Sequence, residues 1–569
     1  MEYLVNHSSK QRSNAKLRWQ VGIETDIGGS PENQDDCFVW VNKEFNLLVL
    51  CVLDGHGREV GKVAAESAKC CMLKFLDDNY LSLIANPTEF LIKAYEVAHE
   101  HIRRSFRMEF ERQGYEVVKA APEGYLMKRK PPLSCWSCIH GGTSCSMVAF
   151  VGNELYVSNV GDSTGILCSA HGVLTSSMVN HLQDAAVSDD VSRTFKSNRK
   201  HFSSASESPT SVSDCLEAHS EYSITSNTII ITAEHSAECP YEYERLHRYR
   251  PREGHPLLPA LSVVYDDSHI HDKSKCPPVF EKNIDGTLCV TNSGRYLLGQ
   301  LCSHDTRVVL VLFLSKITCV GFIITILISI FVLSYYKNVR KEWASLVSTP
   351  PYARFQDALA FTRSIGDLHL HTYGACMTAF THIIIIIYHH HHHPFIIIMH
   401  IIIITVIIII LSLSLCTSSS SQSLSSSSSS SQSCTLGVTH LPEIQKIDLD
   451  IIFNRMLETQ LLLLPPTTVH QTSSCIDAQT SEIASNTLCL VLATDGVWDN
   501  WLYEDVNKFV MDASCLEAVA SNTDGARRVT QSFMQRNSLF AKRNFGSSAD
   551  NATSIIVYFS RSQQLPSSI

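Results

Sequence analysis

The sequence lacks the features of several large protein classes. Its 569 residues have a formal net charge of −10 and no stripe of Lys and Arg, so we expect no nucleic-acid binding. Residues 1–20 are polar and basic, without the apolar core of a signal peptide. The 20 cysteines follow no regular spacing, which argues against a disulfide framework and favours a reducing compartment, cytoplasmic or nuclear.

One pair of cysteines does stand at a motif spacing, Cys135-Trp-Ser-Cys138. A structural zinc site of this kind needs a second pair at a fixed distance, and no such pair is present. We therefore expect these cysteines to be plain thiols. His369, His371 and the five consecutive histidines at 389–393 are expected at the surface or in low-complexity sequence, and not at a metal ion.

Two stretches have the length and composition of membrane spans. Ile317–Ser334 is uncharged and mostly apolar, and Phe395–Leu415 is nearly continuous Ile and Leu, followed by a serine tract at 417–433. Membrane insertion is nevertheless disfavoured. A span at the first stretch, with or without the second, would leave Asp367 across the bilayer from Asp54, and segments of one domain cannot pack together through lipid.

The most informative stretch is Leu47–Gly57, which reads L-L-V-L-C-V-L-D-G-H-G. Seven apolar residues in a row predict a strand buried on both faces, and this strand ends at Asp54, close to His56. Glycines on both sides of His56 allow a tight turn and a close approach to a ligand. The plain alternative is an Asp-Gly turn that only ends a strand.

Acidic residues recur at the ends of other predicted strands. A single one would indicate only a turn, but seven of them suggest a shared acidic pocket. These residues are Asp35, Asp54, Asp162, Asp367, Asp495, Asp499 and Asp550. Carboxylates packed together repel one another, and a pocket of them is tolerable only with cations present. Oxygen ligands select hard ions, Mg²⁺ or Mn²⁺, and two such ions can clamp a phosphate and activate water.

Seven motifs follow one another along the chain: N-Q-D, D-G-H-G, G-G-T-S, N-V-G-D-S, T-R-S-I-G-D, D-G-V-W-D and D-N-A-T. In this order they resemble the metal-dependent protein serine/threonine phosphatase family of type 2C (PPM), over about residues 21–560 apart from two inserts. The resemblance implies an α+β fold in which two stacked antiparallel β-sheets are flanked by helix pairs, an αββα sandwich with the metals at one edge.

The resemblance also implies an enzyme. A protein-serine/threonine phosphatase of this family is a phosphoprotein phosphohydrolase that depends on Mn²⁺ or Mg²⁺. It hydrolyses phosphoserine and phosphothreonine with metal-activated water and without a covalent phosphoenzyme. We therefore expect phosphoprotein substrates, a role in signalling, and a monomer.

Matching positions imply the ligands of two Mn²⁺ or Mg²⁺ ions. Asp54 would be shared by both ions through its carboxylate. The Gly55 carbonyl would bind one ion, and Asp495 and Asp550 would complete the other. The implied ligand set is therefore made of oxygen atoms alone.

Other matching positions imply supporting roles. Asp35 would hold water that a metal ion binds, and Asp162 with Asp499 matches the site of a weaker third ion. His56 matches the proposed general acid, which suits an imidazole because its ordinary pKa is near neutral. Asp367 is expected to be structural, because the family's metals are not usually bound there. G-G-T-S is expected to shape a tight turn.

The sequence departs from the family pattern in three places. The arginine that grips the substrate phosphate is replaced by Ser30, the arginine after N-V-G-D-S by Thr164, and the glycine after D-G-H-G by Arg58. Loss of a bidentate phosphate contact would weaken binding and transition-state stabilisation. The alternative to an active phosphatase is therefore a catalytically weak or inactive binding module on the same fold.

We expect the domain to be assembled from three parts of the chain. In order, the segments are a leader at 1–20, a first part at 21–296 with a mobile loop at about 184–227, an apolar insert at 297–335, a second part at 336–374, an Ile/His/Ser-rich insert at 375–437, a third part at 438–560 and a tail at 561–569. Sequence on either side of each insert is ordinary globular sequence, which favours late insertion, for example of unremoved introns.

Overall fold

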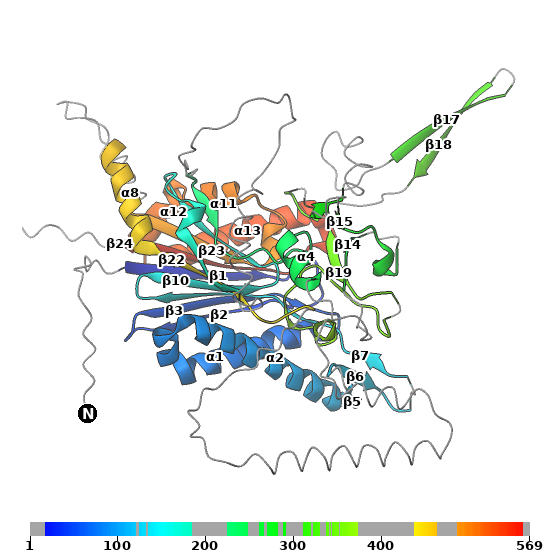
Figure 1. Ribbon diagram of the computed structural model, residues 1–569. Coiled ribbons are helices and arrows are strands. Elements are labelled where there is room, and N and C mark those ends of the chain that lie inside the picture. Colours follow the sequence, from blue (N-terminus) through cyan, green and yellow to red (C-terminus); the bar gives the residue numbers. More distant parts are fainter. Residues whose placement is uncertain are drawn as a thin grey trace, which may run out of the picture.

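Apolar strands form two antiparallel β-sheets that stack face to face, with helices on both outer faces (Figure 1). This confirms the expected fold class. The computed structural model describes residues 17–120, 124–132, 135–184, 225–247, 261–266, 270–282, 288–291, 311–319, 322–330, 337–340, 342, 344–351, 353–373, 437–463 and 486–561.

One sheet has five strands and brings the two ends of the described chain together. Its order is β1 (Leu17–Asp26), β24 (Ala552–Arg561), β23 (Thr487–Ala493), β11 (Thr164–Ser169) and β13 (Thr228–Ile230). The first strand begins at Leu17, within the stretch 1–20 that the sequence analysis expected to be a leader. The expected boundary after residue 20 therefore cuts through β1. Leu17 is 2% exposed and belongs to the core between the sheets, so the strand extends back to it.

The other sheet has six strands and contains the buried run from Leu47. Its order is β12 (Val179–Asp184), β22 (Glu443–Asp448), β10 (Glu154–Val160), β9 (Cys145–Val151), β3 (Leu47–Leu53) and β2 (Asp36–Asn42). Every residue of β3 is buried, because one face meets the other sheet and the opposite face meets helices. The continuous apolar run therefore predicted its burial correctly.

Helices cover the outer face of each sheet (Figure 1). The helices are α1 (Gly61–Ala85) and α2 (Pro87–Arg112) on the six-stranded sheet, and α11 (Tyr503–Val510), α12 (Ala513–Ser521) and α13 (Gly525–Phe545) on the five-stranded sheet. Neighbouring residues define the start of α2. Pro87 lies in its first turn, and the Asn86 side chain accepts a hydrogen bond from the Glu89 N–H at 3.3 Å.

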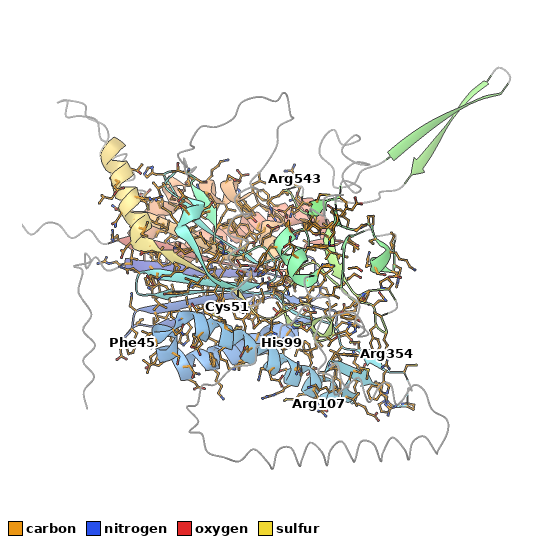
Figure 2. The ribbon with its side chains drawn as sticks, in the orientation of Figure 1. Phe45, Cys51, His99, Arg107, Arg354 and Arg543 are labelled. Carbon is orange, nitrogen blue, oxygen red and sulfur yellow. The ribbon has the colours of Figure 1, made fainter. Side chains whose placement is uncertain are left out.

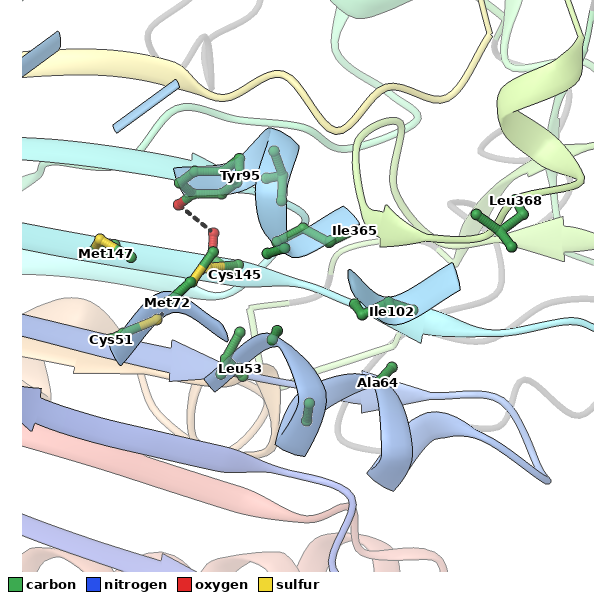
Figure 3. Close-up of a cluster of buried hydrophobic side chains, with 14 of the residues drawn as sticks. Cys51, Leu53, Ala64, Met72, Tyr95, Ile102, Cys145, Met147, Ile365 and Leu368 are labelled. Atoms are coloured by element: carbon green, nitrogen blue, oxygen red, sulfur yellow. Dashed lines mark hydrogen bonds between the residues drawn. The ribbon is translucent and has the colours of Figure 1, made fainter. Parts of the chain in front are cut away.

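Buried side chains join the layers into one body. The Tyr95 hydroxyl of α2 lies 3.2 Å from the Cys145 carbonyl oxygen (Figure 3). It also lies 2.9 Å from the Ser158 carbonyl oxygen, and its single proton can be donated to either, which fixes the helix on β9 and β10. Figure 2 shows Cys51 inside this body, while Arg107 and Arg543 lie out on the two helical layers. Each fully buried apolar side chain stabilises the fold by about 1.5–3 kcal/mol relative to exposure.

A smaller region with its own apolar core adjoins the sandwich. Its elements are α4 (Pro240–His247), β14 (Ser262–Tyr265), β15 (Phe280–Lys282), β16 (Leu288–Val290), β19 (Ser345–Ser348) and β20 (Ala358–Leu359). The strand pairs β14–β19 and β10–β22 each join chain from the two sides of an insert. Strands from before and after the inserts thus pair with each other.

Short elements complete the described chain. They are β4 (Gly55–His56), β5 (Glu116–Lys119), β6 (Leu126–Arg129), β7 (Ser137–Cys138), β8 (Gly142–Thr143), β21 (Ile365–Gly366), α8 (Leu449–Leu463), α10 (Asp495–Trp498) and the 3₁₀ turns η1 (Ser176–Met178), η3 (Lys273–Lys275), η4 (Leu370–Thr372) and η5 (Gly546–Ser548). Three of the motifs meet here, because β4, β8 and β21 pair as one small sheet with β8 in the centre.

The first insert contains a hairpin of β17 (Val311–Cys319) and β18 (Phe322–Ile330), which projects from the sandwich (Figure 1). The second apolar stretch, the five histidines, the serine tract and residues 185–224 of the expected mobile loop lie outside the described residues. Within the described part of the chain, no helix is both long and apolar enough to cross a membrane.

Candidate active site

Three carboxylates from the two sheets converge at one edge of the sandwich. Asp54 follows β3 of the six-stranded sheet, Asp495 follows β23 of the five-stranded sheet, and Asp162 lies in the turn from β10 to β11, which links the sheets. One carboxylate oxygen from each residue lies within 4.8 Å of those of the other two. Strand ends from both sheets therefore build one acidic cluster.

The cluster is poorly neutralised within the protein. Burial, followed by the charges of Asp495 and Asp35, raises the pKa of Asp54 well above its ordinary value. Burial and the charge of Asp162 do the same to the pKa of Asp495. The Oδ1 atoms of Asp162 and Asp495 are buried with no hydrogen-bond partner. Unpartnered buried oxygens of this kind fit a divalent cation that accepts oxygen ligands.

Asp35 and Asp550 lie beside the three converging carboxylates. Burial raises the pKa of Asp35 to about 7, although a hydrogen bond from the Thr494 hydroxyl at 2.8 Å opposes the shift. Burial likewise raises the pKa of Asp550. Asn551 ties the two segments together, because its side-chain oxygen accepts from the Gln34 N–H at 2.8 Å. Thr494, which precedes D-G-V-W-D, and Asn551, which belongs to D-N-A-T, are thus positioning residues that the sequence analysis did not single out.

A lysine that the sequence analysis missed approaches the cluster. Lys337 Nζ lies 4.0 Å from Asp162 Oδ2. Burial opposes protonation of Lys337, but Asp162 and Asp499 raise its pKa overall. The Val339 N–H donates to the Asp499 carbonyl at 3.1 Å, which holds this segment in place. No motif marks Lys337, since only the tertiary fold brings the segment after the first insert to the site.

Asp499 lies on the Lys337 side of the cluster. Burial raises the pKa of Asp499 to about 7, against the lowering effect of Lys337 and Arg340. Asp499 follows α10, and its N–H donates to the Asp495 carbonyl at 2.7 Å. The short helix therefore fixes the spacing between these two acidic residues.

His56 stands beside the cluster and pairs with Asp367. Its Nε2 lies 2.8 Å from Asp367 Oδ2. Burial alone would lower the pKa of His56, but the Asp367 carboxylate raises it, so the pair favours the protonated imidazole. The other ring nitrogen, Nδ1, is buried and has no hydrogen-bond partner. Asp367 is 3% exposed and faces the histidine, which gives it an orienting role.

The small sheet of β4, β8 and β21 explains why these two residues meet. Gly142 pairs with His56 on one side and with Gly366 on the other. G-G-T-S is therefore the central strand of this sheet, and the expectation of a simple tight turn is wrong. Gly57 has φ +106°, and a Cβ there would lie 2.7 Å from the Gly141 Cα. Glycine is required here, because any other residue would be strained at this positive φ and its Cβ would clash with the Gly141 backbone.

Two histidine predictions are corrected by the structure. His369 is 3% exposed. His371 is half-buried. Its ring stacks on His440 and lies tilted beside His99, and burial lowers the pKa of His371 to about 3. The expectation of a surface position is therefore wrong for His369, and His371 is only partly exposed. Both follow T-R-S-I-G-D, which passes through the core, so their spacing in the sequence did not reveal their burial.

The motif-based family assignment is confirmed over part of the chain, because residues 88–187 match the family model described as protein phosphatase 2C. Among solved structures, the chain is similar to serine-threonine phosphatase 2C from Toxoplasma gondii, with 12% identity, 96% of each chain covered and a TM-score of 0.37. It is also similar to the serine/threonine phosphatase of S. agalactiae, with 10% identity, 95% of this chain and 99% of that chain covered and a TM-score of 0.33. No curated protein matches the chain. At these TM-scores the structural likeness supports no argument by itself.

Proposed function

We propose that this chain, whose residues 88–187 match the protein phosphatase 2C family, is a metal-dependent phosphatase of phosphoserine and phosphothreonine in proteins. The main support is the convergence of Asp54, Asp162 and Asp495, whose oxygens lie within 4.8 Å of one another. Such a cluster needs cations, and cations beside a protonated imidazole suit hydrolysis of a phosphate ester.

The residues of the site fit two Mn²⁺ or Mg²⁺ ions. Asp54, Asp495, Asp550 and the Gly55 carbonyl would hold them, since all four offer hard oxygen ligands. Bound ions would lower the pKa of water and offset the charge of the phosphate. A third, weaker ion would lie between Asp162 and Asp499, the side of the cluster that Lys337 approaches, and Asp35 would hold water near the ions.

The chain supplies the proton for the leaving group. His56 would donate it to the seryl or threonyl oxygen, because Asp367 favours the protonated imidazole and fixes its orientation. Lys337 would add positive charge beside Asp162, in a chain in which Ser30 and Thr164 replace two arginines of the family pattern. An ammonium group makes a point contact and lacks the paired contacts of a guanidinium, so we expect weaker phosphate binding than the family pattern implies.

Phosphate release from phosphoserine and phosphothreonine peptides tests the proposal. With Mn²⁺ or Mg²⁺ present, the protein should release phosphate, and an excess of EDTA should stop the release. If no metal supports turnover although phosphopeptides bind, the alternative of a catalytically inactive binding module is correct.

The affinity for Mn²⁺ should depend on pH around neutrality. In the metal-free protein the pKa of Asp35 and that of Asp499 are about 7. Because folding raises the pKa of both carboxyl groups, they take up protons near neutral pH in the folded protein. Below pH 7 these protons compete with cations for the carboxylate oxygens. We expect the Mn²⁺ affinity to fall as the pH drops from 8 to 6, measured by titration calorimetry. An affinity that is constant over this range would show that neither Asp35 nor Asp499 takes up a proton in competition with the metal ion.

Lys337→Met should weaken substrate binding more than it slows turnover. Loss of one contact to a charged group costs about 1.5–3 kcal/mol, so we expect KM for a phosphopeptide to rise by about tenfold or more. Lys508→Met is the matched control, because Lys508 is an exposed lysine of α11 that pairs with Asp505. If the two variants have the same KM, Lys337 does not contact the substrate.

A further inference from the structure

We propose a second metal site, separate from the acidic cluster, in which Cys138, His140, Asp357 and His369 bind one Zn²⁺ ion. The four residues come from three separate segments of the chain. Cys138 ends β7, His140 follows it, Asp357 precedes β20, and His369 precedes η4. This site is independent of the proposed phosphatase activity, because it shares no residue with the acidic cluster or with the His56–Asp367 pair.

The ligand atoms already lie close together. One ligand atom each from Cys138, His140 and His369 lies within 4.8 Å of the other two. Asp357 Oδ2 is 2.7 Å from His140 Nδ1 and 4.0 Å from His369 Nδ1. One thiol, two imidazoles and one carboxylate are four ligands, which is the number of a closed tetrahedral zinc site. A thiolate with imidazoles favours zinc over Mg²⁺ or Mn²⁺.

The orientation of His369 provides an independent observation. Its Nε2 lies 3.2 Å from the Tyr373 hydroxyl, so this nitrogen is engaged away from the cluster. Its Nδ1 is the atom nearer Asp357, and it is buried with no hydrogen-bond partner, in a side chain that is 4% exposed. Metal-binding histidines are typically held in this way, with the second ring nitrogen hydrogen-bonded.

The surroundings suit a structural metal ion. Tyr125 and Phe355 pack against the His369 ring with centroids 4.9 and 6.0 Å away, which shields the site with aromatic carbon. Burial and the charge of Asp357 raise the pKa of the Cys138 thiol to about 12. Zinc would bind the thiolate, so metal binding must release the thiol proton together with any proton on His140.

A neighbouring histidine cluster is a weaker candidate for the same ion. His99, His371 and His440 also bring ring nitrogens within 4.8 Å of one another. Two of their ring pairs are stacked, with interplanar angles of 20° and 15°. Lone pairs in nearly parallel rings do not converge on one point, whereas the planes of His140 and His369 are 83° apart. The three histidines also provide no anionic ligand.

Zinc at this place would brace the segment that presents Asp367. His140 and His369 lie next to the backbone contact in which the Asp367 N–H donates to the Gly141 carbonyl at 2.9 Å. Asp367 itself has φ +42°, a conformation that needs support from its surroundings. We therefore expect bound zinc to stabilise this part of the fold without touching the substrate.

Zinc content of the purified full chain tests the site. After incubation with Zn²⁺ and removal of unbound ions by gel filtration, elemental analysis by inductively coupled plasma mass spectrometry should find one Zn²⁺ per chain. Cys138→Ser and His369→Gln should weaken zinc binding by at least about tenfold. Cys135→Ser is the matched control, because Cys135 belongs to the same C-x-x-C but is exposed, and it should bind zinc normally. His440→Gln should also bind normally.

Cobalt substitution keeps the test decisive if a variant fails to fold. Co²⁺ bound to the wild-type chain should give a thiolate-to-cobalt charge-transfer band and the intense visible bands of a tetrahedral site. The proposal is overturned if wild-type protein holds no zinc, if Cys138→Ser retains full affinity, or if Co²⁺ shows no thiolate band. Loss of zinc in His440→Gln alone would instead assign the metal to the stacked histidines. Because none of these measurements uses phosphatase activity, failure of one proposal does not imply failure of the other.

Discussion

Asp54→Asn is expected to abolish phosphate release while making the metal-free protein more resistant to heat. The amide preserves the shape of the side chain but removes a charge buried against Asp162 and Asp495. Removing one charge from a repelling cluster should raise Tm by at least about 2 °C, which corresponds to about 1 kcal/mol in a domain of this size. Activity should fall by at least about a hundredfold, because the site loses the carboxylate that two ions would share.

Thermal unfolding in EDTA and phosphate release at saturating Mn²⁺ measure the two effects. Asp505→Asn is the control, since the Asp505 side chain on α11 is 47% exposed and its ion pair with Lys508 lies at the surface. It should change neither activity nor Tm appreciably. An Asp54→Asn protein with wild-type turnover would remove Asp54 from the metal site. One that loses stability in EDTA would show that the cluster is not repulsive.

Glu242→Gln should destabilise the protein by about 3–5 kcal/mol. Glu242 is fully buried between two arginines, with Oε1 2.5 Å from Arg363 Nη2 and Oε2 2.8 Å from Arg245 Nη2. Burial raises the pKa of Glu242, but both arginines lower it well below its ordinary value. The amide would leave two buried cations without their shared anion. Arg363 belongs to T-R-S-I-G-D, so the loss should also loosen the segment that contains Asp367.

Urea denaturation of the variant against wild type gives the free-energy difference. Glu96→Gln is the control, because the Glu96–Lys93 pair on α2 is exposed and should contribute less than about 1 kcal/mol. A Glu242→Gln protein within 1 kcal/mol of wild type would mean that the surrounding groups satisfy both arginines without the carboxylate.

Local sequence patterns were sufficient to predict much of the fold. The apolar run predicts β3 from neighbouring residues alone, and this prediction is confirmed. The Gly152–Asn153 turn between β9 and β10 and the Asn86 cap of α2 likewise depend on neighbouring residues. Edges were harder. The start of β1 at Leu17 depends on pairing with β24 at the far end of the chain, which no local pattern encodes.

The same distinction holds at the candidate sites. Strand-end carboxylates such as Asp54 and Asp495 stand beside apolar runs, so the sequence marked them. Lys337 and His369 stand in segments whose positions depend on tertiary contacts. No local pattern singled out Lys337, and His369 was expected at the surface. The sequence analysis looked for zinc ligands as two closely spaced cysteine pairs. That criterion cannot detect the proposed set, in which Cys138 is combined with the distant Asp357.

The pairing of β1 with β24 has a consequence for synthesis on the ribosome. Asp35, Asp54 and Asp162 emerge early, whereas Asp495 and β24 emerge only near the end of translation. A nascent chain halted within either insert would present Asp35, Asp54 and Asp162 without Asp495 and Asp550, and thus without a complete set of the proposed metal ligands. Such a fragment would also lack β23 and β24, so the edges of β1 and β11 that pair with these strands would be exposed to solvent. Quality control would therefore meet an unfinished sandwich.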